Sequence, residues 1–311
     1  MLLVAFILSV GTDLSWPKGI VRRWVGRAFW ANRLQDWRVN DGRLECTCDD
    51  KRFLVRTVFV YTREIVRGNG GATLSVRTGL ISGDAPDAFS GFLIGIGAGK
   101  LDYRACALVQ GLSGEGGGML AVFEMDGTCS FRDHSSEERP AAFSKLPCEE
   151  RRSKNYKRHE GEDVLLTLEI SPNGRGKFDL SLRAVDRRTG EEISRATMRG
   201  VDDEKLVGGI ALVSHPGRRG GKGRGARFWF ADLTIEGEKV AVHPERAWGP
   251  IAGVFFSLNR NVLKLNAQFF PTGKTAFDPP QEFPKARLDY RPRGEKAWRK
   301  GPIASVKTPS N

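Results

Sequence analysis

Two strand-like runs flank a loop of glycines and arginines between Leu206 and Gly237. The first run, 206–214, is apolar, and the second, 226–236, alternates apolar with polar residues and slips in phase at Ala231 and Asp232. Alternation with a period of two is typical of a strand with one buried face, and the slip predicts a β-bulge. The loop 217–227 holds five cations and five glycines, so it cannot contribute to a core and must be solvated.

Short apolar or alternating runs, separated by turn signals, fill most of the remaining chain. Asn40-Asp41-Gly42 predicts a hairpin turn between strands at 37–39 and 44–46, since glycine accepts a positive φ. About a dozen strands and no convincing helix predict an all-β sandwich of the jelly-roll type. Further strands are expected at 52–64, 73–78, 91–99, 101–110, 119–125, 163–170, 178–186 and 193–198.

A boundary is expected near 242–250, where two prolines interrupt the strand pattern. Four short strands are predicted beyond it, at 253–256, 262–269, 285–291 and 297–299, and they resemble the first half of an immunoglobulin- or fibronectin-like module. The domain prediction is therefore a sandwich at 20–242 and a partial β-module at 250–311. Residues 131–160 are very polar and predict an exposed insertion with a short helical turn.

The apolar run at 1–10 is too short to span a bilayer as a helix. It has the length of the apolar part of a signal peptide, although no Lys or Arg precedes it and no clear cleavage site follows. Residues 1–16 are therefore read as an export signal or as a buried first strand. An export signal would place the protein in the cell envelope or outside the cell, and otherwise it would be cytoplasmic.

The chain has 311 residues, a net charge of +12 and a pI of about 9.7, which permits anionic partners. The five cysteines argue against a fully paired disulfide framework, although a Cys129–Cys148 bridge is possible. The four histidines lack a partner at metal-ligand spacing, and His215 is interpreted as a solvated loop residue.

The run GFLIGIGAG at 91–99 places three glycines on one face of a strand, where something must pack closely. It is not a nucleotide-binding loop, because the following LDYRACALVQ alternates as a strand instead of opening a helix. On that strand Asp102 and Arg104 share a face, either as a polar ligand site on a concave surface or as a cross-strand ion pair. Glu124 and Asp126 share a face as well and could form the carboxylate pair of a glycosidase.

The pair GGIAL and FWFADLTIEG resembles the closing hairpin of concanavalin A-like lectin and glucanase sandwiches. The order of segments resembles the N-terminal region of bacterial alkaline phosphatase D-like metallophosphatases. That likeness rests on FWANRLQDWRVNDGRLEC, GFLIGIGAGKLDYRACALVQG, LVGGIALVSHPG, ARFWFADLTIEG and GPIAGVFFSLNRNVLKLNAQ. In that family a lectin-like sandwich and a small β-module precede a two-metal phosphoesterase domain.

The metal-binding motifs of that phosphoesterase domain are not found in this sequence. Gly83-Asp84-Ala85-Pro86-Asp87 matches one of them by letter but has no partner clusters, so it is interpreted as a turn. The resemblance therefore implies that this chain lacks the catalytic domain, carries no catalytic residues and holds no metal or cofactor. A metallophosphatase domain in cis or in trans would then be its partner.

The sequence thus predicts a non-catalytic, carbohydrate-binding or scaffolding β-sandwich. The alternatives are a weak glycoside hydrolase and a binder of anionic polymers through the Arg/Gly loop 217–227 and the basic segment 151–158. Nucleic acid is not the expected partner, because RGG-type segments that bind it come as longer repeats with interleaved aromatic residues. The candidate ligand-binding residues are Asp102, Arg104, Arg218, Arg219 and Arg224.

Overall fold

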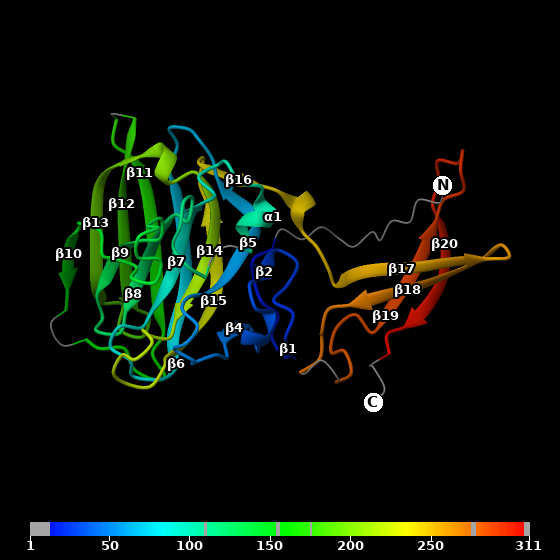
Figure 1. Cartoon of the computed structure of the whole chain (residues 1–311), viewed down its shortest axis with the longest axis horizontal. Helices are drawn as coiled ribbons and strands as arrows, with labels where there is room; N and C mark the ends of the chain where they lie inside the picture. Colours follow the sequence, from blue (N-terminus) through cyan, green and yellow to red (C-terminus); the bar gives the residue numbers. More distant parts are fainter. Residues whose placement is uncertain (1–12, 109–110, 154–155, 175, 275–277, 308–311) are drawn as a thin grey trace.

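The computed structural model describes residues 13–108, 111–153, 156–174, 176–274 and 278–307. Within these ranges two large antiparallel sheets pack face to face as a sandwich, and two separate hairpins follow (Figure 1). The prediction of an all-β jelly-roll sandwich followed by a small β-module is confirmed. An export signal or a first strand was expected at 1–16, of which 1–12 lie outside the described residues. Leu14 and Trp16 are buried in the core of the sandwich and belong to no strand.

One sheet has nine strands in the described part of the chain. Along each strand, alternate residues are buried against the other sheet, as in Phe178, Leu180, Leu182 and Ala184. In sheet order the strands are β1 (Val21–Arg22), β3 (Trp37–Asn40), β4 (Arg43–Cys46), β15 (Arg227–Glu236), β6 (Ala72–Ser82), β11 (Val164–Pro172), β12 (Lys177–Asp186), β13 (Glu192–Asp202) and β10 (Glu149–Arg152).

The other sheet has seven strands among the described residues, and its central strands are buried on both faces. Both faces are buried because loops cover the side that faces away from the first sheet. Its order is β16 (Val240–Val242), β5 (Arg56–Ile65), β14 (Gly208–His215), β7 (Phe89–Ile96), β8 (Met119–Glu124) and β9 (Cys129–Asp133), with β2 (Phe29–Ala31) paired to β5.

The two runs that flank the Arg/Gly loop do not form the expected hairpin. β14 pairs with β5 and β7 in the seven-stranded sheet, whereas β15 pairs with β6 and β4 in the nine-stranded sheet. The loop therefore crosses from one sheet to the other. The predicted β-bulge is confirmed, since the register of β15 with β6 shifts between Ala231 and Thr234, and Asp232 has a φ of 50°.

The predicted strand at 101–110 is wrong in the described residues. β7 ends at Ile96, Gly97 and Gly99 adopt positive φ in the following turn, and Tyr103–Cys106 forms the short helix α1. The glycines are closely packed, as expected, but Gly97 and Gly99 lie in a turn and not on one face of a strand. A Cβ on Gly97 would lie 2.5 Å from Sγ of Cys106, because α1 folds directly back over the end of β7.

Residues 131–160 are not simply an exposed insertion. They contain the end of β9 and all of β10, and they also bury Phe143 and His134 against the outer face of the seven-stranded sheet. The sequence did not indicate that Phe143 and His134 are buried, because each is a single position within a strongly charged segment. All five cysteines are free thiols, so the possible Cys129–Cys148 bridge is not formed.

The two C-terminal hairpins extend to one side of the sandwich (Figure 1). They consist of β17 (Ile251–Asn259) with β18 (Val262–Phe269), and of β19 (Lys285–Tyr290) with β20 (Arg299–Ser305). The connecting segment anchors them, because the Phe270 ring stacks on Trp24 at 6.1 Å and Gln281 accepts a hydrogen bond from the Val21 amide at 2.7 Å.

A buried ion pair links the two sheets inside the sandwich. The Nε of Arg158 donates to Glu162 at 2.6 Å, and both side chains are almost fully buried. The guanidinium lies between the rings of Phe123 on β8 and Phe228 on β15, at 4.8 and 4.4 Å. It also donates to the Ser90 hydroxyl on β7 at 2.6 Å.

We expect Glu162→Gln to lower the free energy of unfolding by about 3–5 kcal/mol, because it leaves the Arg158 charge buried without a carboxylate. Urea unfolding monitored by tryptophan fluorescence measures this loss. The double variant Arg158→Met/Glu162→Gln removes both charges and should be more stable than the single variant. If the double variant is less stable than the single variant, then neutralising the buried Arg158 charge is not how Glu162 stabilises the fold.

Candidate functional site

Asp102 and Arg104 lie at the start of α1 instead of on a strand. Asp102 caps the helix by accepting from the Arg104 amide at 2.8 Å, and its two oxygens also accept from the guanidinium at 2.9 and 3.0 Å. This contact holds the pKa of Asp102 at about 2. The predicted pair is therefore real, but it is a local helix-cap pair and not a cross-strand one.

The residue between them, Tyr103, belongs to a half-buried cluster of four aromatic rings. The Tyr103 ring meets Tyr61 edge-on at 5.4 Å, Tyr61 lies 6.0 Å from Trp248, and Trp248 lies 4.8 Å from Trp30. Trp30 on β2 and Tyr61 on β5 come from the outer face of the seven-stranded sheet, whereas Trp248 comes from the linker before β17. We call these four residues the aromatic cluster.

Charged groups surround the aromatic cluster. Arg246 and Arg104 lie over the Tyr103 ring at 4.5 and 5.4 Å from its centre, and Arg246 is also bound to Glu64 at 2.8 Å. Burial raises the pKa of the Tyr61 phenol, and the neighbouring Tyr103 raises it further. The indole Nε1 of Trp30 is buried and has no hydrogen-bond partner among the described residues.

This arrangement combines apolar ring surface with fixed charged donors and acceptors at its edge. Such a combination suits a ligand that has both apolar faces and hydroxyl groups. The sequence could not reveal the cluster, because its members are spread over 218 positions from Trp30 to Trp248.

The Arg/Gly loop 217–227 is attached to the sandwich by the turn at 83–87. Asp87 accepts from the amide and Nε of Arg218 at 3.0 and 2.7 Å, and Asp84 binds Arg224 in the same way. Lys51 donates to the loop carbonyls of Gly221 and Gly223 at 2.6 and 2.9 Å. The two aspartates of the Gly-Asp-x-x-Asp pattern therefore have a structural partner.

Two of the three arginines predicted to bind a ligand in this loop are thus already neutralised. Arg218 and Arg224 are paired with Asp87 and Asp84, whereas Arg219 is exposed and makes no ion pair within the described part of the chain. The loop therefore has three cations without an ion pair among the described residues, instead of the five in its composition. It does not come together with Asp102 and Arg104.

We expect Asp84→Asn/Asp87→Asn to speed tryptic cleavage within 217–225 severalfold, because a released loop exposes its Arg and Lys bonds to the protease. Limited proteolysis followed by mass spectrometry measures the cleavage rate. The matched control is Asp126→Asn, which removes an exposed carboxylate that pairs with Arg152 elsewhere. Equal rates in the loop for both variants would show that the aspartates do not hold it.

The carboxylates considered for glycoside hydrolysis are occupied by different partners. Glu124 is buried and forms ion pairs with Arg132 and Lys145 at 3.0 and 3.1 Å, while Asp126 pairs with Arg152 at 2.7 Å. A glycosidase needs two carboxylates that act on one bond, whereas these two are held by different cations. This geometry offers no support for the glycosidase alternative.

His215 is not the solvated loop residue that the sequence suggested. It is buried at the end of β14, 4.5 Å from the Phe89 ring, and burial lowers its pKa to about 4. His134 is likewise buried and stacks on Phe143 at 5.5 Å. Burial also raises the pKa of Cys106 to about 11, so its thiol stays protonated at neutral pH.

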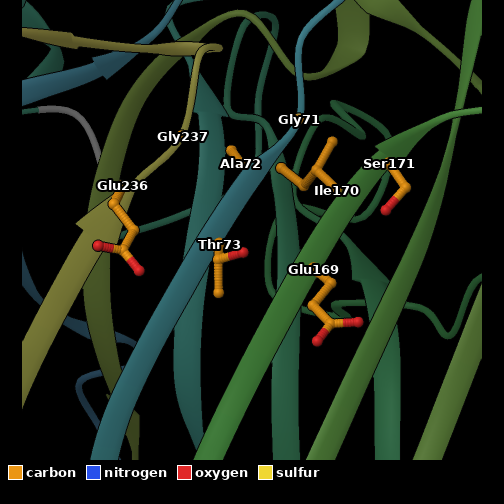
Figure 2. A pocket seen from close by; sticks show the side chains of 8 residues that line it. All are labelled: Gly71, Ala72, Thr73, Glu169, Ile170, Ser171, Glu236 and Gly237. Atoms are coloured by element: carbon orange, nitrogen blue, oxygen red, sulfur yellow. The ribbon is translucent and has the colours of Figure 1, made fainter.

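A hollow of about 490 Å³ lies on the outer face of the nine-stranded sheet (Figure 2). Glu236, Thr73 and Glu169 face one another across β15, β6 and β11 in register, and neither glutamate makes an ion pair within the described residues. A second hollow of about 960 Å³ lies between the two C-terminal hairpins and is mostly apolar. Neither hollow contains the candidate residues.

In the described ranges no three His, Cys, Asp or Glu side chains gather closely enough to hold a metal ion. The described helices are all too short to cross a bilayer.

The structure is similar in fold to several solved lectins at low sequence identity. Peanut lectin in complex with a nine-residue peptide is 15% identical, with a TM-score of 0.40 over 68% of this chain and 93% of that one. Lectin II from Ulex europaeus is 10% identical, with a TM-score of 0.42 over 73% and 97%. The metal-free carbohydrate recognition domain of Emp46p is 9% identical, with a TM-score of 0.44 over 73% and 98%. No protein-family model and no curated protein matches the sequence.

Proposed function

We propose that this protein is a non-catalytic β-sandwich that binds a carbohydrate at the aromatic cluster. The single observation that supports this most is the set of four half-buried rings beside the Asp102–Arg104 pair. The rings come from β2, β5, α1 and the linker before β17, all of which meet at one edge of the seven-stranded sheet.

The chemistry of a sugar fits both parts of this surface. A pyranose ring presents C–H groups on its faces and hydroxyl groups around its rim. The C–H faces can lie on aromatic rings, which supply rigid contact area at a low entropic cost. Asp102 stays ionised because its pKa is lowered, so it can accept from hydroxyl groups, and Arg104 can donate to them.

We expect Tyr103→Ala to weaken glycan binding on the order of tenfold, since one ring that contacts the ligand is removed. Asp102→Asn/Arg104→Gln should weaken it by a similar factor. A glycan array with the wild-type chain identifies the ligand, and calorimetric titration of that glycan measures each variant. Phe256→Ala is the control, because Phe256 is an exposed aromatic residue on the C-terminal hairpin.

The proposal fails if the array shows no glycan bound by the folded chain. It also fails if Tyr103→Ala binds the glycan as tightly as the wild type while Phe256→Ala loses affinity. Far-UV circular dichroism of each variant confirms that the sandwich remains folded.

We also propose that the chain acts beside a metallophosphatase domain, in cis or in trans. The order of the segments along the chain supports this proposal, as does the small β-module that follows the sandwich. In this arrangement the sandwich would hold a glycan or scaffold the catalytic domain. Export to the cell envelope belongs to the same proposal and rests on the apolar run at 1–10.

We expect the purified chain alone to leave bis(p-nitrophenyl) phosphate intact in the presence of Ca²⁺, Mn²⁺ or Zn²⁺. Two-metal hydrolysis needs a cluster of carboxylate and imidazole ligands that clamps both metals. Release of p-nitrophenol is read by absorbance against a no-protein blank. Metal-dependent turnover that copurifies with the chain would overturn the non-catalytic assignment.

A further inference from the structure

Three arginine side chains stand in one row on the outer face of the nine-stranded sheet. Arg151 on β10 faces Arg195 on β13, and Arg195 faces Arg183 on β12. These strands are neighbours at the left end of the sandwich in Figure 1. Since neighbouring strands lie about 4.8 Å apart, the row is about 10 Å long. Ala196 and Leu182, which alternate with these arginines, are buried in the core, so the arginines point outward.

One carboxylate forms an ion pair with the row, and Glu169 on the neighbouring strand β11 acts on Arg195 from farther away. Glu192 pairs with Arg195 at 2.5 Å, whereas Arg151 and Arg183 make no ion pair in the portion of the chain that the structure describes. The pKa of Glu192 is lowered, first by the hydrogen bond from Arg195 and further by the charges of Arg183 and Arg151. The row therefore carries excess positive charge within a short distance.

Such a row is unfavourable for the fold itself. Like charges that face each other directly across neighbouring strands repel, which destabilises the sheet. The next position inward in the same register is Thr167 on β11, followed by Ser75 on β6, so hydroxyl donors extend the row. An anion placed along the row would relieve the repulsion and accept hydrogen bonds from both kinds of group.

We propose that Arg151, Arg195 and Arg183 form a binding site for the ester sulfate groups of an acidic polysaccharide. The planar guanidinium binds such oxyanions with two parallel N–H donors, which makes arginine better suited to them than lysine. Three guanidinium groups at strand spacing offer contacts to successive anionic groups along one chain. The site is independent of the aromatic cluster, which lies on the other sheet.

Two features of this face favour a polysaccharide over nucleic acid. The outward positions of β10, β12 and β13 carry no aromatic residue in the described ranges, so unpaired bases would have no ring to stack on. The face is also the side of a broad sheet, whereas the elements that read duplex DNA are single helices or two-stranded ribbons that enter a groove.

The row and the Arg/Gly loop differ in how their cations are held. Among the described residues, Arg151 and Arg183 of the row make no ion pair, and Arg219, Lys222 and Arg227 of the loop make none either, while Arg218 and Arg224 are paired with aspartates. The row is preferred as the anion site because strand register holds its guanidinium groups side by side at a fixed spacing.

The test is the salt dependence of heparin binding by the full chain. We expect Arg151→Gln/Arg183→Gln to weaken binding on the order of tenfold at low salt. It should also reduce the slope of log K against log salt concentration by about two, one for each cation removed. Because repulsion is relieved, the same variant should unfold at an equal or slightly higher urea concentration than the wild type.

Two charge-matched variants serve as controls. Arg219→Gln/Lys222→Gln removes two exposed cations of the loop, and Lys100→Gln/Lys205→Gln removes two exposed lysines elsewhere. Both should keep at least most of the wild-type affinity. Chemically desulfated heparin should not bind.

Several results would overturn the proposal. These are absence of heparin binding by the wild-type chain at 50 mM salt, an equal loss of affinity in all three double variants, and unchanged affinity in Arg151→Gln/Arg183→Gln. Tighter binding of oligo-dT or duplex DNA than of heparin through the same arginines would assign the row to nucleic acid instead.

Discussion

The sandwich depends on a buried ion pair, in which Glu162 neutralises the charge of Arg158 between the two sheets. Arg158 enters between the sheets from the segment after β10, and it contacts Phe123 and Phe228, which belong to opposite sheets. Glu162 neutralises it and accepts from the Leu80 amide at 3.0 Å and from the Tyr156 hydroxyl at 2.8 Å. Because removing one partner of such a pair costs several kcal/mol, the pair fixes the position of the 156–162 segment against both sheets.

The seven-stranded sheet has two apolar faces. One face forms the main core, and the other is covered by the loops after β7 and β9, which contribute Cys106, Ala107 and Phe143. The cover ends near β2 and β5, where the remaining outward residues are Trp30 and Tyr61. The aromatic cluster is thus the uncovered margin of a second apolar core, which explains why its rings are half-buried and held in fixed positions.

The sequence was sufficient for the elements and insufficient for their pairing. Alternation identified β15 and its bulge, and Asp41-Gly42 identified the turn between β3 and β4, because these signals are local. The assignment of β14 and β15 to different sheets depends on long-range pairing that adjacency in the chain does not encode. Asp102 and Arg104 alternated as in a strand, yet the positive φ of Gly97 and Gly99 and the cap at Asp102 turn that segment into α1.

The sequence did not predict which cations are free to bind a ligand, because composition counts cations but does not show which of them pair with carboxylates. The Arg/Gly loop contains five cations, but the turn at 83–87 neutralises two of them, Arg218 and Arg224. The cations of the arginine row are scattered over β10, β12 and β13, and only the strand register places them side by side. A basic surface on a β-sandwich is therefore determined by cross-strand register, and neighbouring carboxylates can neutralise part of the charge of an arginine-rich loop.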